Sequence, residues 1–399
     1  MLLNADYLNE HCHCSTLDKS KIEHAHFFSQ HPHFLSLDDL HQMQAFIEAH
    51  ERLLGVGLPA LSPAEGNLPL KAVERGIFNS YDFHISDNGP QLIEINTNAA
   101  GALLGLHAEK EMMQCCEGLP GYLSHPGFAF DSGKIVEMFR REFALRFPGR
   151  SLRRVAIVDE NPREQFFYSE FVLVQQTLQS HGIDAVIVAP EALTIRENVR
   201  YANELPFDNA QGRPLDFIYN RLTDFAFEKP SSATLKQIYE HGLATVSPNP
   251  AVHALYANKA NLTLFWSDAA NNMPQTDLAT VRAHLPETVF VTAANADLLW
   301  SQKKEWFFKP VDGYGGKGVY RGDKLTTKVW QHIIGGSYIA QRYIAPRTRQ
   351  VTEATSLKYD VRVYTYAGEI LGLMARYYQG QTTNFRTEHG GLAGVLVMR

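Results

Sequence analysis

The sequence predicts a mixed α/β protein, with a parallel sheet in the middle of the chain and antiparallel hairpins before and after it. Between residues 153 and 188, short apolar strands alternate with a helix, which is typical of a parallel sheet. Residues 77–97 and 359–377 each contain two strands around a tight polar turn, which predicts antiparallel hairpins. Near residue 306 an apolar strand runs directly into a glycine-rich loop, a pattern typical of a phosphate-binding flap.

Length and composition narrow the class of protein. The chain has 399 residues, 45% of them hydrophobic and 20% charged, which is ordinary for a globular protein of two or three domains. We place these domains at residues 1–150, 151–250 and 251–399. The net charge of −6, without a strongly basic block, argues against nucleic acid as a partner.

Nothing in the sequence points to a membrane or to export. No apolar run approaches the roughly 20 residues that a membrane-spanning helix needs. The N-terminus lacks the basic and apolar regions of a secretory signal. Four cysteines in a chain of 399 residues do not suggest a disulfide framework. We interpret Cys115-Cys116 as residues packed in the core or as a pair on the surface. We therefore expect a cytoplasmic protein without a membrane partner.

The N-terminal arm, residues 1–35, is rich in histidine and cysteine. The run His11-Cys12-His13-Cys14 offers zinc ligands, but it lacks the spacers that are usual in a tetrahedral site. A polar arm over the surface is the favoured interpretation, and a metal site is the alternative. The arm is followed by a predicted scaffold helix at residues 36–54, which has an apolar stripe and a serine cap.

The second strand of the first hairpin carries a candidate ligand pair. Side chains alternate across a strand, so Glu94 and Asn96 share one face while Ile93 and Ile95 lie on the other. Carboxylate and amide oxygens suit Mg²⁺ bridged to phosphates, because such an ion takes only one or two ligands from the protein. The alternative is a solvent-facing strand edge.

The parallel sheet predicts a second group of polar residues at the ends of its strands. A strand at residues 217–219 is followed directly by Arg221, and Asn161 and Gln165 follow the first strand of the unit. Polar residues at strand carboxyl ends commonly meet ligands in open α/β sheets, so these three can line one crevice. Arg221 can bind a substrate carboxylate with two hydrogen bonds. An ordinary surface ion pair explains it equally well.

The glycine-rich loop at residues 311–319 follows Lys309. Its glycines allow backbone N–H groups to approach an anion closely. The loop lacks the serine or threonine of a Walker loop and the helix of a dinucleotide fingerprint. A flexible surface hairpin is the alternative. Lys259, early in the helix after Ser247-Pro248-Asn249-Pro250, is another candidate phosphate ligand or a solvated lysine.

The last quarter continues with a strand, a hairpin and a polar loop. In the strand 337–344, the Gln341 side chain and the Ile344 backbone can meet the edge of an adenine. In the hairpin, Asp360 and Arg362 share one face and Arg376 lies on the returning strand, where arginines can balance triphosphate charge.

Taken together, these segments resemble the ATP-grasp superfamily. The marks are FKPVDGYGGKGVY, YIAQRYI, KYDVRVYTYAGEILG and FRTEHGG, in that order along the chain. In the usual order a metal-binding Glu-x-Asn follows them, whereas here EIN stands at 94–96. This resembles the circularly permuted arrangement of eukaryotic-type glutathione synthetase, whose SDYMF and IEINT are similar to NSYDFHISDNGPQLIEINT here. The resemblance covers roughly residues 75–399, and it is weak in the middle of this range.

The resemblance implies an ATP-grasp fold with an inserted parallel-sheet, substrate-binding subdomain at 151–250. It also implies site residues by position. These are Glu94, Asn96 and Asp312 for Mg²⁺; Lys259, Lys309, Gly313, Gly315 and Gly316 for the ATP phosphates; Tyr320, Gln341, Arg342, Tyr343, Ile344, Asp360 and Arg362 around the nucleotide; and Arg221, Arg386, Asn161 and Gln165 for the substrates, the two arginines gripping carboxylates.

Three positions depart from the family pattern. Asp312 stands where the family has glutamate, and its spacing differs by one. Asp224 replaces a tyrosine three residues after the substrate arginine, and Glu388 replaces a lysine two residues after the last arginine. The last two departures bear on the identity of the peptide substrate more than on the use of ATP.

The expected activity is that of an ADP-forming ligase that joins a small carboxylate to an amine through an acyl phosphate. Magnesium, lysines and arginines would stabilise charge on the phosphoryl group, and a closed flap would exclude water. A kinase of the same architecture and a nucleotide-binding module without catalysis are the alternatives. The oligomeric state stays open, with a homodimer among the options.

Overall fold

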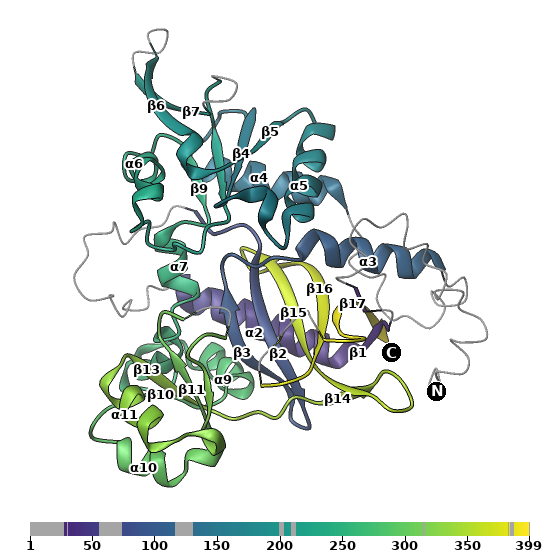
Figure 1. Cartoon of the computed structure of the whole chain (residues 1–399), viewed down its shortest axis with the longest axis vertical. Coiled ribbons are helices and arrows are strands. Elements are labelled where there is room, and N and C mark those ends of the chain that lie inside the picture. The colour runs from purple at the N-terminus through teal and green to yellow at the C-terminus, as the bar shows by residue number, and fades with distance from the viewer. Residues whose placement is uncertain are drawn as a thin grey trace.

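The computed structural model describes residues 28–29, 31–55, 74–115, 131–198, 203–208, 213–313, 316–381, 383 and 387–398. The His/Cys-rich run at 11–14 and Cys116 therefore lie outside the described residues. Three β-sheets dominate the structure (Figure 1). Among the described residues, no helix is both long and apolar enough to span a membrane.

The central sheet is built from the two ends of the chain. Its strands run in the order β1-β17-β16-β15-β2-β3, with β14 paired to β15. Only β1 and β17 pair in parallel, and the remaining pairs are antiparallel. The strands are β1 (His33–Ser36), β2 (Asn79–Ser86), β3 (Gly89–Asn96), β14 (Thr348–Gln350), β15 (Ser356–Tyr366), β16 (Glu369–Tyr378) and β17 (Gly391–Met398). The two predicted hairpins are confirmed and lie side by side.

Helices cover the two faces of this sheet. The predicted scaffold helix is α2 (Leu37–Gly55), and its buried stripe packs with Tyr81 and Phe83 of β2. On the same face lie α7 (Pro250–Tyr256), α8 (Asn261–Leu264) and α9 (Gln275–His284). On the opposite face, α3 (Ala102–Cys115) packs against β16 and β17. Strand alternation therefore leaves Asp82 and His84 on the face away from α2.

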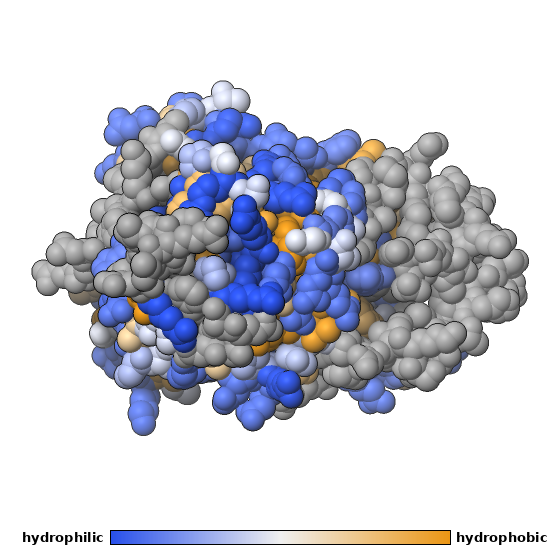
Figure 2. All heavy atoms as spheres, turned by 90° about the horizontal axis from the view of Figure 1, so that it is seen from above, coloured by the Kyte–Doolittle hydropathy of each residue, from blue (hydrophilic) through white to orange (hydrophobic). Residues whose placement is uncertain are grey.

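The middle of the chain forms the α/β unit. Its strands are β4 (Arg154–Val158), β5 (Asp184–Val188), β8 (Phe217–Asn220) and β9 (Thr245–Ser247). They are all parallel in the order β5-β4-β8-β9, which confirms the predicted parallel sheet. Its helices are α4 (Ser132–Arg146), α5 (Tyr168–Ser180) and α6 (Ala233–Glu240), and the hairpin β6 (Leu193–Asn198) and β7 (Asn203–Asp208) extends from it. Seen from this end, the surface is mostly hydrophilic, with small hydrophobic areas (Figure 2).

A third sheet, the lid sheet, carries the glycine-rich loop. Its strands are antiparallel in the order β10-β13-β11-β12, and it has its own small core around Trp306 and Trp330. The strands are β10 (Thr288–Phe290), β11 (Trp306–Pro310), β12 (Tyr320–Arg321) and β13 (Tyr338–Arg342), and the helices are α10 (Ala296–Ser301) and α11 (Thr327–Gly335). The short 3₁₀ turns of the chain lie at Pro162–Glu164, Pro190–Ala192, Pro230–Ser232, Asp268–Asn272, Lys303–Glu305 and Gly322–Lys324.

Candidate functional site

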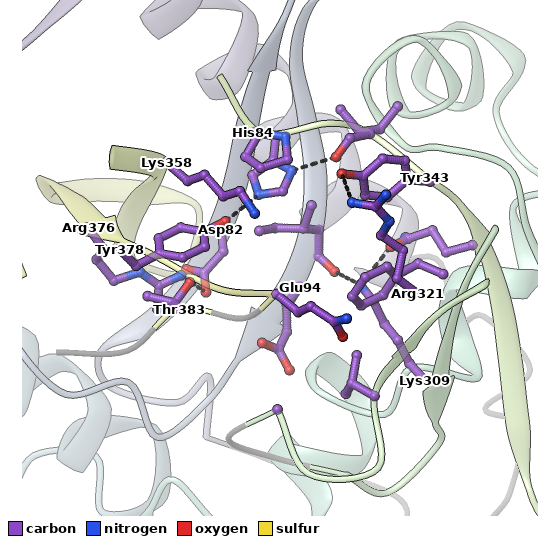
Figure 3. A pocket seen from close by; sticks show the side chains of 18 of the residues that line it. Asp82, His84, Glu94, Lys309, Arg321, Tyr343, Lys358, Arg376, Tyr378 and Thr383 are labelled. Carbon is purple, nitrogen blue, oxygen red and sulfur yellow. Dashed lines mark hydrogen bonds and ion pairs between the residues drawn. The ribbon is translucent and has the colours of Figure 1, made fainter. Parts of the chain in front are cut away.

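A cavity of about 310 Å³ lies between the lid sheet and the central sheet (Figure 3). It is lined by segments from the first quarter and the last third of the chain. The lining residues are Asp82, His84, Ile93, Glu94, Asn96, Lys259, Phe307, Lys309, Gly316, Val319, Arg321, Gln341, Arg342, Tyr343, Ile344, Pro346, Lys358, Arg362, Arg376, Tyr378, Gln381 and Thr383.

The predicted ligand pair on β3 opens into this cavity. Glu94 is half-buried, and its Oε1 lies 3.2 Å from Nζ of Lys259. Asn96 donates from Nδ2 to Oδ2 of Asp82 over 3.3 Å. The strand alternation that predicted a shared face for Glu94 and Asn96 therefore applies, and that face is turned to the cavity rather than to bulk solvent.

Two lysines approach the same space from the lid side. Lys309 on β11 is buried, and its Nζ donates to the Ile93 carbonyl at 2.6 Å and to Oε1 of Gln341 at 2.7 Å. Burial lowers the pKa of Lys309 to about 8, although Glu94 acts to raise it. Lys259 donates to the Gly313 carbonyl at 2.6 Å, at the start of the glycine-rich loop. A buried ammonium whose partners are mostly neutral carbonyls is suited to an anion.

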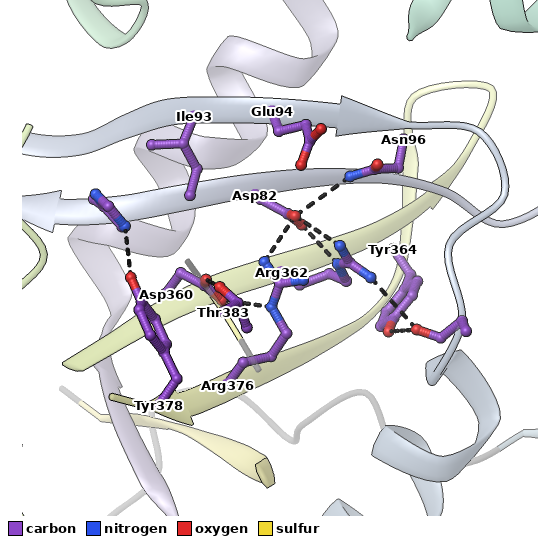
Figure 4. Close-up of polar contacts among 12 residues, drawn as sticks. Asp82, Ile93, Glu94, Asn96, Asp360, Arg362, Tyr364, Arg376, Tyr378 and Thr383 are labelled. Atoms are coloured by element: carbon purple, nitrogen blue, oxygen red, sulfur yellow. Dashed lines mark hydrogen bonds and ion pairs between the residues drawn. The ribbon is translucent and has the colours of Figure 1, made fainter. Parts of the chain in front are cut away.

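A buried quartet of two carboxylates and two guanidinium groups lies beside the ligand pair (Figure 4). Arg362 donates to both Asp82 oxygens, at 2.6 and 2.7 Å. Arg376 bridges Asp82 at 2.8 Å and Asp360 at 2.6 Å. Burial acts to raise the pKa of Asp82, but the two arginines hold it below its usual range. The two negative and two positive charges of the quartet balance. Its hydrogen bonds fix the two guanidinium groups at the cavity wall.

Residues 341–344, at the end of β13, form another wall of the cavity and are called the hinge from here on. The sequence predicted that Gln341 and Ile344 meet the edge of an adenine. Gln341 is buried, accepts from Lys309 and donates to Oγ1 of Thr288 at 3.2 Å, so both ends of its side chain are bound within the protein. The Ile344 carbonyl accepts from Nδ1 of His84 at 2.9 Å. The Tyr343 ring stacks near Phe307, with centroids 6.2 Å apart. The hinge thus offers an apolar wall with one carbonyl at its end.

Several predicted site residues do not line this cavity, among the residues that the structure describes. Asp312 is exposed in the turn after β11 and is not among the described lining residues, so its role as a third metal ligand stays a prediction. Tyr320 packs on Tyr338 instead, and Asp360 is buried beneath Arg376. Gly316 lines the cavity but Gly313 meets it only through Lys259. Gly315 and Arg386 lie outside the described residues.

Sequence reasoning did not identify Asp82 and His84 as cavity residues. Both lie on β2, and in the sheet Asp82 stands opposite Glu94. The signal was available in the alternation of polar Ser80, Asp82 and His84 with apolar residues, because a polar row next to Glu94 and Asn96 must share their face. The pairing of β2 with β15, which brings in Arg362, has no such local signal.

The three substrate-binding candidates of the α/β unit do not share one crevice. Asn161 lines a polar hollow of about 450 Å³ at the ends of β4 and β5, and among its described lining residues are neither Arg221 nor Gln165. Gln165 is hydrogen-bonded to the Glu160 carbonyl at 2.5 Å. Arg221 is buried, with its guanidinium over Phe171 and Tyr219, so it is not part of a surface ion pair.

Arg221 faces the loop that joins β3 to α3. It donates to Oδ1 of Asn98 and to the Tyr219 hydroxyl at 3.2 Å. The next residues of this loop meet the cavity side, since the Ala100 carbonyl accepts from Arg362 at 3.5 Å and from Tyr364 at 2.7 Å. Nearby, burial raises the pKa of Asp159 to about 6 against the effect of Arg221. The loop 97–101 therefore connects Arg221 to the cavity side.

The lining residues fit a magnesium-bound polyphosphate. Among the described lining residues, seven lysine and arginine side chains face two carboxylates. Arg321 and Arg342 are paired with acidic residues, Asp323 and Glu287, so the lysines carry most of the excess positive charge. Glu94 and Asn96 supply hard oxygen atoms beside these cations, and phosphate oxygens with water can complete the shell of Mg²⁺. No cluster of three or more His, Cys, Asp or Glu side chains that could hold a metal by itself occurs within the described ranges.

Solved structures share the fold of this chain. The apo structure of a glutathione synthetase-like effector from Globodera pallida aligns with a TM-score of 0.54 at 10% identity, over 93% of this chain and 90% of that chain. A putative gamma-glutamylcysteine synthetase from Methylobacillus flagellatus KT aligns with a TM-score of 0.48 at 13% identity, over 91% of this chain and 89% of that one. The ATP-grasp ligase PsnB, complexed with a minimal precursor, aligns with a TM-score of 0.33 at 10% identity, over 62% and 90%. No protein-family model and no curated protein matches the sequence.

At these identities the likeness concerns the fold. The first match extends over nine-tenths of both chains. The chain therefore shares its fold with a glutathione synthetase-like protein.

Proposed function

We propose that this protein is an ATP-dependent, ADP-forming ligase that joins a small carboxylate to an amine. One observation carries the proposal. Glu94 and Asn96, from the first quarter of the chain, face Lys309 and the hinge, from the last quarter, across a single cavity (Figure 3). The fold shared with a glutathione synthetase-like effector supports the same assignment.

In the proposed reaction, a carboxylate oxygen attacks the γ-phosphorus of ATP and ADP leaves. An amine nitrogen then attacks the carbonyl carbon of the acyl phosphate, forming the amide and releasing phosphate and a proton. Mg²⁺, held by Glu94 and Asn96, would neutralise charge on the phosphate oxygens. No protein nucleophile is required, because positioning and electrostatic stabilisation account for most of the catalysis of phosphoryl transfer.

The chain's own residues divide this work. Lys309 and Lys259 bind phosphate oxygens from the lid side, and Arg362 and Arg376, fixed by Asp82 and Asp360, present their guanidinium groups on the sheet side. We place the substrates beside the loop 97–101, with Arg221 and Arg386 as the groups that bind carboxylates. Gln381 and Thr383 line the cavity, so the segment that leads to Arg386 begins there.

The direct test is product analysis with the full chain. Mg·ATP is incubated with mixtures of amino acids or short peptides as carboxylate and amine donors, and ADP, phosphate and amide are quantified. The expected result is equal release of ADP, phosphate and amide. A stable phosphorylated product without amide would indicate a kinase, and bound ATP that is never converted to ADP with any mixture would refute the ligase assignment.

A substitution tests the role of the ligand pair. Glu94→Gln keeps the shape of the side chain and removes its charge, so we expect turnover to fall by roughly 100-fold or more, as for other groups that stabilise transition-state charge. Nucleotide binding, measured by calorimetry, should change much less. The exposed Glu353→Gln is the matched control and should leave both unchanged. Equal loss of turnover and of binding in Glu94→Gln would contradict the assigned role.

A further inference from the structure

His84 occupies a place in the cavity that the proposed chemistry does not use. It lies on β2, 260 residues before Ile344 of the hinge, and its ring bridges the central sheet and the end of the lid sheet. Its exposed fraction is 8%, and it lines the cavity near Tyr343, away from Glu94 (Figure 3). A buried polar ring in a cavity wall requires a reason, because burying it without partners is costly.

The hydrogen bonds of His84 define its tautomer. The Ile344 carbonyl can only accept, so Nδ1 at 2.9 Å must carry the proton. In a neutral ring Nε2 is then an acceptor, and the Tyr378 hydroxyl donates to it over 3.3 Å. Burial lowers the pKa of His84; Lys309 and Arg376 also lower it, while Asp360 and the Ile344 carbonyl act to raise it. The ring is therefore held as a neutral donor to the hinge.

The hinge carbonyl is left with one free lone pair. A backbone carbonyl oxygen has two lone pairs, and His84 takes one of them. The cavity lining also includes apolar and aromatic side chains, Phe307, Val319, Tyr343 and Pro346, which can meet the flat face of a nucleobase. The Arg321 guanidinium lies over the Tyr343 ring, 5.0 Å from its centroid. The Gln341 side chain is bound to Lys309 and Thr288 and is not available to a base. The Ile344 carbonyl is thus a fixed acceptor at the base end of the cavity.

We propose that His84 is a positioning residue for the nucleobase: by fixing the Ile344 carbonyl, it makes the site prefer a purine with an exocyclic 6-amino group over a 6-oxo purine. An adenine amino group donates to the remaining lone pair, whereas the carbonyl oxygen of guanine meets that acceptor with repulsion. This inference rests on the proposed nucleotide site, and it adds which residue sets the base preference. A site built to pair a polar group rejects a ligand that cannot pair with it.

The test compares binding of Mg·ATP and Mg·GTP to the full chain by calorimetry. We expect the unsubstituted protein to prefer ATP. His84→Leu removes the donor, so ATP binding should weaken by roughly 10-fold, the size of one hydrogen bond, while GTP binding changes by less than about 2-fold and the preference falls. His84→Asn places an amide donor near the position of Nδ1 and should restore most of the preference.

The outcomes separate this inference from the proposed function. Equal weakening of ATP and GTP binding in His84→Leu would show a merely structural role and overturn the inference, as would an unchanged ATP:GTP ratio. If the Leu variant does not fold, Tyr378→Phe serves instead: it removes the donor to Nε2, frees the ring to turn, and should lower the preference. An unsubstituted protein that binds neither nucleotide would refute the nucleotide site and this inference together. One that binds both equally would refute only the inference.

Discussion

At the scale of single residues, Lys309 has the most informative environment. It is fully enclosed between the Ile93 carbonyl and Gln341, and burial brings its pKa down to about 8. Phosphate binds the protonated amine, so an anion in the cavity and a proton on Lys309 favour each other. Nucleotide affinity should therefore depend on pH near the lowered pKa of Lys309.

We predict that affinity for Mg·ATP is constant below pH 8 and falls above it, by up to about tenfold per pH unit, as the protonated fraction of Lys309 decreases. Calorimetry from pH 7.5 to 9.5 measures this. Lys309→Met should bind weakly with a flat profile, and the exposed Lys328→Met should behave like the unsubstituted protein. A flat profile in the unsubstituted protein would argue against contact between Lys309 and phosphate.

The pKa shift of Lys309 does not destabilise the folded protein at high pH, so unfolding would not explain a loss of Mg·ATP affinity above pH 8. The folded-state pKa of Lys309, about 8, lies below its ordinary value of 10.5. Between these values the unfolded chain binds more protons at this site than the folded chain. The contribution of Lys309 to the free energy of unfolding therefore rises with pH over this window. Weaker binding together with unchanged or greater stability is thus the expected pattern.

At the scale of elements, the lid sheet depends on a close approach between two 3₁₀ turns. Gly322 is buried, and a Cβ built on it would lie 1.7 Å from the Lys303 carbonyl oxygen and 3.0 Å from that of Trp306. Both neighbours are backbone atoms, so no side chain can move aside to make room. The turn at 303–305 and the turn at 322–324 can therefore pack together only with glycine at this position.

We predict that Gly322→Ala lowers the free energy of unfolding by roughly 1–3 kcal/mol, the range observed for overpacked sites, and weakens nucleotide binding through the displaced lid. Gly335→Ala is the matched control, because its Cβ would meet nothing within 4 Å and it lies at the end of α11. Denaturant unfolding and calorimetry measure the two effects. Equal stability of the two variants would contradict the backbone clash.

The kind of element that carries a residue determined whether its place in the site could be predicted. On β3, alternation of polar and apolar residues placed Glu94 and Asn96 on one face, and that arrangement needs no tertiary information. The same rule applied to β2 would have identified Asp82 and His84. By contrast, the turn containing Asp312 has no periodicity, so the sequence could not indicate that its side chain is exposed. The burial of Arg221 likewise depends on Phe171 and Tyr219, whose approach is a matter of packing.

At the scale of the whole molecule, the cavity exists because distant segments share one sheet. Strand β2 pairs with β15, so Asp82 meets Arg362 across 280 residues of sequence. The lid sheet then closes over this surface through Lys309, which reaches the Ile93 carbonyl on β3. The α/β unit is tied in separately, where Glu170 accepts from the backbone N–H groups of Gly101 and Leu103.

This arrangement predicts how a bound nucleotide changes hydrogen exchange. Mg·ADP should slow amide exchange in β3 and in β13 together, because both line one cavity, and it should leave β5 of the α/β unit unchanged. Mass spectrometry of the full chain with and without Mg·ADP measures this. Protection confined to the first quarter or to the last quarter of the chain would contradict a shared site.

Local features could be predicted without tertiary information: the parallel alternation of the α/β unit, the two hairpins, the helix expected at 36–54, and the common face of Glu94 and Asn96. These follow from periodicity, turn residues and propensity, which act over a few neighbouring residues. Three outcomes required long-range contacts: β2 lies beside β15, His84 donates to the Ile344 carbonyl, and Asp360 is buried while Asp312 is exposed. Those outcomes depend on contacts between residues far apart in the chain, where many alternative pairings satisfy the same local pattern and only packing of the whole core distinguishes them.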